Sequence, residues 1–156
     1  MICMANKEWS PAELKFKAEA YCAAAERCEA DVRTKLKQWN CTAATADEIV
    51  DFLYSANFLS DERYCAAFVH DKLIFQGWGR VKMEYMLRAK HLPAAAIRVA
   101  IDSIDEIEYF RVLSHLLETK RKTLIGNPVD NTDSIFRFLL QRGFTSNEIA
   151  RVLNKN

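Results

Sequence analysis

The sequence has 156 residues, 50% of them apolar, which is enough to bury the core of one average domain. It contains only four glycines and three prolines, and it is rich in Ala, Leu, Glu, Lys and Arg, a composition that favours long helices. A β protein with many turns is therefore excluded, and we predict an all-α fold. The formal net charge of +1 conceals a separation of positive from negative residues along the chain.

The cysteines and the N-terminal residues indicate the compartment of the protein. Five cysteines occur, with no C-x-x-C pair and no histidine at zinc-ligand spacing, so we expect no metal site. Apart from Cys3, they fall among apolar positions of predicted helices, as reduced cysteines do in a reducing cytosol: Cys22, Cys28, Cys41 and Cys65. The chain begins without a secretion signal and has no run of about 18 apolar residues that spans a membrane. We expect a cytoplasmic monomer without membrane contact.

Three helix starts are marked by Ser or Thr three residues before Glu, the pattern of a capping box. The pattern occurs in the segments Ser10–Glu13, Thr45–Glu48 and Thr145–Glu148. It predicts that Ser10, Thr45 and Thr145 each satisfy free amide groups at the start of a helix.

A further helix is predicted to start at Ser60, with Asp61 in the first turn, where carboxylates meet the positive end of the helix dipole. This helix is predicted to end at Gly77 and Gly79, which give the backbone freedom to turn. Trp78 between the glycines is expected to pin the turn against the core. We therefore expect Ser60, Asp61, Gly77, Trp78 and Gly79 to have structural roles.

Apolar residues recur with a period of about 50 residues, which indicates tandem repeats. The recurring sets are Leu36, Cys41, Ile49 and Leu53; Leu87, Leu92, Ile97 and Ile101; and Leu139, Phe144, Ile149 and Leu153, with three extra residues at 42–44 in the first set. The predicted helices are 12–28, 30–39 and 46–56; 60–76, 80–90 and 93–103; and 105–124, 133–142 and 146–154.

The repeats predict an elongated, curved array of three tandem three-helix units, because stacked units share faces with their neighbours. The expected division is an N-terminal tail at residues 1–11, followed by repeats at 12–58, 59–104 and 105–156. The segment Gly126–Asn131 carries the strongest turn signal and is expected to be the most mobile internal loop.

No motif in the sequence indicates catalysis. His70 and Asp71 are adjacent, so on a helix their side chains point about 100° apart, and no nucleophile motif accompanies them. His91 and His115 stand alone, and no phosphate-binding loop is present. We expect a non-enzymatic protein that needs no cofactor.

Charged residues separate along the chain. Residues 72–98 contain six cations and one acid, whereas residues 99–118 contain five acids and one cation. Such runs are ordinary solvated helix faces about as often as they are contact surfaces, and composition does not decide between the two. The case for a contact is that Arg80, Arg88 and Lys90 lie on or beside an exposed helix pair of the middle repeat, where they suit phosphates or an acidic protein surface.

The same stretch resembles the RecX family of cytosolic bacterial modulators of the RecA recombinase. The resemblance rests on the segments Phe58–Tyr64, Ala67–Val69, Gly77–Arg80 and Leu87–Lys90, and more weakly on residues 26–36 and 138–144. His91 departs from the family pattern, which has glycine before the apolar residue that closes this helix.

The resemblance implies three tandem three-helix repeats and a non-enzymatic protein that binds in the groove of the RecA filament on DNA. Bound there, it would hinder filament growth and strand exchange and lower ATP hydrolysis, with consequences for recombination, DNA repair and the SOS response. Weak direct contact with DNA is compatible with this role.

We predict that Lys72, Arg80, Lys82, Arg88 and Lys90 attract the partner electrostatically. Reversing Arg80, Lys82 and Arg88 to Glu is expected to weaken filament binding and to leave the fold intact. Two alternatives remain: a direct DNA-binding helical protein, and a helical adaptor for a protein unrelated to recombination.

Overall fold

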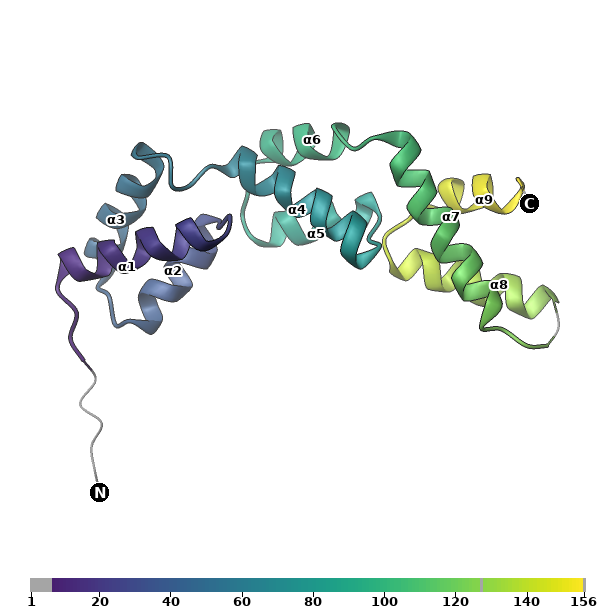
Figure 1. The fold of residues 1–156 in the computed structure, drawn as a ribbon, viewed down its shortest axis with the longest axis horizontal. Coiled ribbons are helices and arrows are strands. Elements are labelled where there is room, and N and C mark those ends of the chain that lie inside the picture. Colours follow the sequence, from purple (N-terminus) through teal and green to yellow (C-terminus); the bar gives the residue numbers. More distant parts are fainter. Residues whose placement is uncertain (1–6, 127, 156) are drawn as a thin grey trace, which may run out of the picture. The chain divides into compact units, whose positions relative to one another are not determined.

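The structure is a computed structural model that describes residues 7–126 and 128–155, with only the backbone described at 128–130. Within these residues every regular element is an α-helix, which confirms the predicted all-α fold (Figure 1). The helices are α1 (Pro11–Ala24), α2 (Glu29–Gln38), α3 (Ala43–Ser55), α4 (Asp61–Gln76), α5 (Arg80–Ala89), α6 (Ala94–Asp102), α7 (Glu106–Lys122), α8 (Pro128–Gln141) and α9 (Ser146–Leu153). They follow one another as three triplets, each opening on its longest helix, as the tandem pattern predicts.

The chain forms two compact units, one up to Tyr64 and one from Cys65. The division falls inside α4, so the first turn of α4 belongs to the first unit. The predicted repeat boundaries, after residues 58 and 104, lie between helices and remain predictions. The second unit holds both the second and the third triplet.

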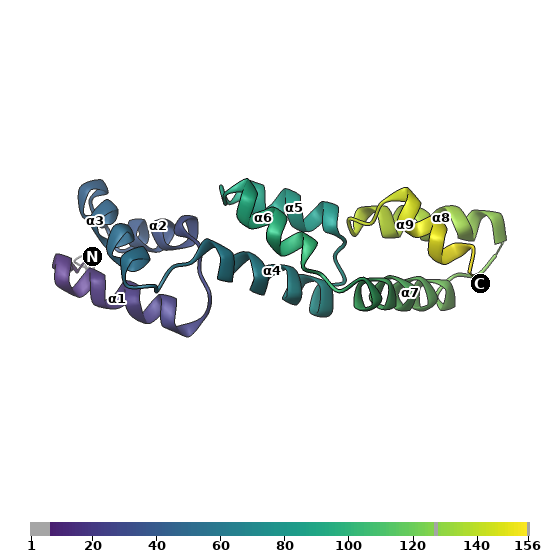
Figure 2. The same ribbon diagram turned by 90° about the horizontal axis from the view of Figure 1, so that it is seen from above.

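In the first unit, α1, α2 and α3 pack against one another around a single apolar core (Figure 2). The core residues are Leu14, Ala18, Cys22, Val32, Leu36, Ala46, Ile49, Val50, Leu53 and Leu59. Cys22, Cys28 and Cys65 are buried as free thiols and Cys41 is half-buried, while Cys3 lies outside the described residues. Burial raises the pKa of the Cys22 thiol, so it stays protonated.

In the second unit, α5 lies beside α6, and α7, α8 and α9 pack together (Figures 1 and 2). The largest fully buried side chains there are Tyr109, Phe144, Met83, Leu87, Ile97, Leu113, Leu117, Leu139 and Ile149. The recurring apolar residues of the sequence thus supply much of the core of both units, because their spacing returns them to the inner face of each helix.

Two of the three predicted capping boxes are confirmed, and the third is wrong. Ser10 and Thr145 each accept a hydrogen bond from the amide of the glutamate three residues later, and that glutamate bonds back to their own amide. Helix α3 begins three residues earlier than predicted, because Thr42 is its N-cap and accepts from the amide of Thr45. The three extra residues of the first repeat therefore add about one turn to the start of α3.

Two other helix bounds differ from the prediction. Helix α1 ends at Ala24, because Cys28 already starts α2 and its amide donates to the Asp31 carboxylate at 3.4 Å. Helix α8 begins at Pro128, so the loop predicted at 126–131 is short, and its residue 127 lies outside the described residues.

The second helix of each triplet ends in the same turn. Asn40, His91 and Gly143 have φ values of 58°, 61° and 96°, in the left-handed region. In each turn the next amide bonds to a carbonyl five residues earlier: Cys41 to Leu36 at 3.0 Å, Leu92 to Leu87 at 3.3 Å and Phe144 to Leu139 at 3.3 Å. This is the Schellman arrangement, so His91 keeps the turn geometry despite replacing a glycine.

Candidate partner-binding surface

Two of the predicted partner-binding lysines lie over the same tryptophan. The Nζ atoms of Lys72 on α4 and Lys82 on α5 lie 4.8 Å and 4.5 Å from the centroid of the Trp78 ring. The edge of Trp78 packs against Phe68, with the centroids 6.2 Å apart. The ring therefore holds both ammonium groups in place and lowers the entropy they lose on binding an anionic partner.

The two glycines around Trp78 have different structural reasons. Gly77 has a φ of 63°, which the left-handed turn at the end of α4 requires. Gly79 lies against Gly143, where a Cβ on Gly79 would come within 2.4 Å of the Gly143 carbonyl. The amides of Gly79 and Val81 donate to the carbonyls of Arg142 and Gly143 at 2.8 Å and 3.1 Å. The free amides at the start of α5 thus meet the free carbonyls after α8.

Arg80 lies at this junction between the second and third triplets. Its side chain is 24% exposed, forms ion pairs with Glu106 and Glu148, and stacks on the Tyr109 ring with its Cζ atom 3.9 Å from the centroid. The distance to Glu148 is 3.2 Å. Arg80 thus connects α5 to α7 and α9.

Tyr109 completes the polar part of the junction. Its hydroxyl accepts from the Arg80 amide at 3.1 Å and donates to Glu148 at 3.2 Å. Burial raises the pKa of the phenol, which therefore remains a hydrogen-bond donor. Every group at this junction is matched, which is what a structural contact requires.

This position changes what is expected of Arg80. Reversing its charge would place a third carboxylate beside Glu106 and Glu148 in a half-buried site. We therefore do not expect the fold to tolerate a reversal that includes Arg80, contrary to the expectation from the sequence.

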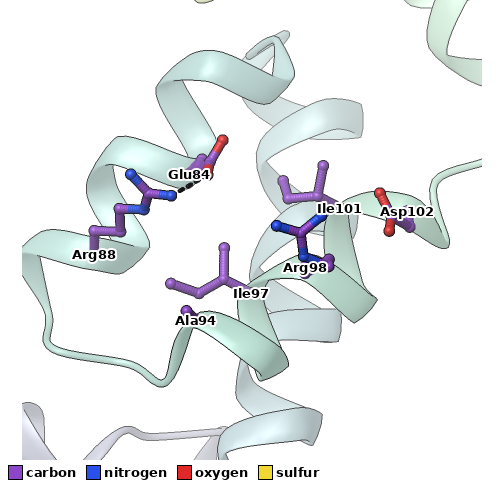
Figure 3. A pocket seen from close by; sticks show the side chains of 7 residues that line it. All are labelled: Glu84, Arg88, Ala94, Ile97, Arg98, Ile101 and Asp102. Atoms are coloured by element: carbon purple, nitrogen blue, oxygen red, sulfur yellow. Dashed lines mark ion pairs between the residues drawn. The ribbon is translucent and has the colours of Figure 1, made fainter.

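Arg88 lies on the exposed side of α5, where a shallow groove runs between α5 and α6 (Figure 3). The Arg88 guanidinium is 67% exposed and pairs with Glu84 at 2.7 Å. The groove has an apolar floor and a charged rim, lined by Glu84, Arg88, Ala94, Ile97, Arg98, Ile101 and Asp102. Lys90 caps the end of α5 and is half-buried.

The start of α4 is fixed by hydrogen bonds inside the first unit. Ser60 Oγ accepts from the Arg63 amide at 3.2 Å, and Asp61 accepts from the Tyr54 hydroxyl at 2.8 Å. Burial, followed by the bond to Asp61, raises the pKa of Tyr54. The Arg63 side chain pairs with Glu26 at 2.8 Å and donates to Asn57. These contacts account for Asp61 and Arg63 without catalysis.

His70 and Asp71 form an exposed pair on α4, 3.2 Å apart, with side chains 69% and 62% exposed. In the part of the chain that the structure describes, no cluster of three potential metal ligands occurs. None of the helices there is long and apolar enough to cross a membrane.

Models of two protein-family domains match this chain: the first three-helix domain of RecX over residues 15–53 and the second over residues 60–101. The regulatory protein RecX of Leptothrix cholodnii is 32% identical over 142 residues, which cover 90% of this chain and 87% of that protein. The chain belongs to the RecX family.

Other RecX proteins agree with this assignment. The regulatory protein RecX of Clostridium tetani is 27% identical over 145 residues, and the chain spans 64% of its length. The crystal structure of RecX from Lactobacillus salivarius matches with a TM-score of 0.80 at 16% identity, covering 93% of this chain and 95% of that one. A second crystal structure of a regulatory protein RecX gives 0.81 at 19% identity, over 92% and 74% of the two chains. The fold is therefore that of RecX, and the relatives are named as regulatory proteins.

Sequence reasoning on this RecX-family chain missed the residues that face Arg80. Glu106 and Glu148 are 26 and 68 positions from it, and no local pattern marks them as its partners. The only signal was the Arg142-Gly143 pair, which carries part of the RecX resemblance and lies against Gly79.

Proposed function

We propose that this protein regulates RecA by binding in the groove of the RecA filament on DNA. Its bound form hinders filament extension and strand exchange and lowers ATP hydrolysis, without a catalytic step of its own. This action takes place in the cytoplasm and bears on recombination, DNA repair and the SOS response. The observation that carries the proposal is membership of a family of regulatory proteins whose fold extends over 92% of this chain.

The proposed contact surface consists of Lys72, Lys82, Arg88 and Lys90, all in the second unit. Lys72 and Lys82 support the proposal most, because Trp78 fixes two ammonium groups side by side. Arg88 adds a guanidinium that stays exposed while paired with Glu84. Positive groups held in this way speed association with a negatively charged partner more than they raise its final affinity.

The test is a titration of RecA ATPase activity and strand exchange with the wild-type protein and with the Lys82→Glu/Arg88→Glu variant. We expect the variant to need about tenfold more protein for half-maximal inhibition at low salt, and this difference to shrink as salt rises. The matched control is Lys122→Glu/Lys155→Glu, which changes net charge equally at exposed sites outside this surface. Circular dichroism checks that both variants are folded.

Equal inhibition by wild type and Lys82→Glu/Arg88→Glu at low salt would reject the proposed surface. Failure of the wild-type protein to affect RecA in either assay would reject the function itself. Retention of a different protein in a pull-down that lacks RecA would then favour the adaptor alternative.

A further inference from the structure

A second group of lysines lies on tryptophan rings in the first unit, away from the predicted site residues. The Nζ atom of Lys17 on α1 lies 3.8 Å from the centroid of Trp9 and 4.6 Å from that of Trp39. Lys7 lies 3.8 Å from the same Trp9 ring. One lysine thus bridges the rings that precede α1 and follow α2.

The alternation of rings and cations continues along the two helices. Tyr21 follows Lys17 by four residues on α1, and Lys35 precedes Trp39 by four residues at the end of α2, so each pair shares one side of its helix. Lys35 Nζ lies 5.6 Å from the Tyr21 ring, which links the two pairs across the helices. We call this surface the α1–α2 face; its residues are Lys7, Trp9, Lys17, Tyr21, Lys35 and Trp39.

The lysines of the α1–α2 face have no carboxylate partner within the described residues. The acids one turn before Lys17 and Lys35 have other bonds, because Glu13 accepts from the Ser10 amide at 2.9 Å and Asp31 from the Cys28 amide at 3.4 Å. The face therefore carries positive charge that the fold leaves uncompensated.

The three rings of this face reach solvent while they anchor it. Trp9, Tyr21 and Trp39 are half-buried and pack against the core of the first unit, so each ring has a fixed position and an exposed part. Rigid aromatic rings interleaved with unpaired cations are the chemistry of surfaces that bind single strands: cations neutralise phosphates, and rings stack on unpaired bases. A duplex hides its base faces, and an acidic peptide uses only the cations.

We infer that the α1–α2 face binds single-stranded nucleic acid directly, with Lys7, Lys17 and Lys35 on the phosphates and Trp9 and Trp39 against the bases. This inference does not depend on the proposed action on RecA, because it requires only the first unit and a naked strand. It gives the chain a second anion-binding surface beside the one around Trp78.

The test measures tryptophan fluorescence of the full chain during titration with an oligothymidylate of about 20 nucleotides, longer than a typical single-strand site. We expect quenching in the wild type and in Trp78→Phe, because Trp9 and Trp39 remain on the face. The Lys17→Gln/Lys35→Gln variant should bind at least about fivefold more weakly, with a log–log salt slope shallower by about 1.4, since each phosphate contact contributes about 0.7.

The matched control is Lys37→Gln, an exposed lysine on α2 outside the cation–ring pairs of the α1–α2 face, which should bind like wild type. Three results would overturn the inference: equal binding by the double variant at low salt, loss of quenching in Trp78→Phe alone, or tighter binding of polyglutamate than of the oligonucleotide. Duplex DNA bound as tightly as the single strand would also overturn it, because the rings would then have no role. RecA is absent from every sample, so the outcome is independent of the proposed function.

Discussion

Arg80 and Arg88 show at the scale of single residues how one residue type serves two purposes on one helix. Arg80 has two carboxylates and an aromatic ring around it, whereas Arg88 is 67% exposed with a partner on its own helix. The sequence presents both as cations of a basic stretch. What separates them is the position of Glu106 and Glu148, which only the packing of α7 and α9 determines.

This difference predicts opposite consequences for stability. Arg80→Glu should lower the free energy of unfolding by about 2–4 kcal/mol, because it leaves a like-charged cluster without a partner in a half-buried site. Arg88→Glu, in contrast, should change it by no more than about 0.5 kcal/mol, since exposed ion pairs contribute little. Urea unfolding followed by circular dichroism measures both. Similar losses for the two variants would show that Arg80 is not part of a structural junction.

At the scale of elements, the turn that ends the second helix of each triplet is the most regular feature of the chain. The same left-handed residue and the same hydrogen bond occur with Asn, His and Gly. Sequence spacing predicted that α2, α5 and α8 end alike. It did not show that Gly143 has a second reason to be glycine, which is its contact with α5.

Alanine substitutions separate these two reasons. A Cβ at Gly143 would lie 2.4 Å from Lys82 Cβ at a φ of +96°, whereas Gly126 has a φ of +123° and no atom within 4 Å of its Cβ position. Gly143→Ala should therefore cost about 3 kcal/mol or more, from both backbone strain and overpacking, and Gly126→Ala only the strain of about 1–2 kcal/mol.

His91→Gly should raise stability by up to about 1 kcal/mol, because it relieves strain at an exposed turn. Thermal unfolding of the three variants measures these effects. Equal losses for Gly143→Ala and Gly126→Ala would mean that α5 moves away from the added Cβ without cost.

At the scale of the whole molecule, the sequence predicted the helical repeats but not their grouping into two compact units. The repeats could be predicted because each apolar set recurs at fixed spacing, and burial requires that spacing locally. The grouping depends on contacts between triplets. Gly79 and Gly143 permit a backbone approach inside the second unit, whereas the corresponding residues one triplet earlier, Cys28 and His91, both carry a Cβ.

Two cores predict that damage to one unit does not pass fully to the other. Trp9 and Trp39 report on the first unit and Trp78 on the second, so Trp78→Phe and Trp9→Phe/Trp39→Phe give one fluorescence probe for each. Added to these backgrounds, Gly143→Ala should lower the urea midpoint seen by Trp78 more than the midpoint seen by Trp9 and Trp39. The reason is that the core of the first unit consists of residues up to Leu59 and has no contact to lose. Coincident shifts would show instead that both units unfold as one cooperative body, with α4, which spans the division, carrying the coupling.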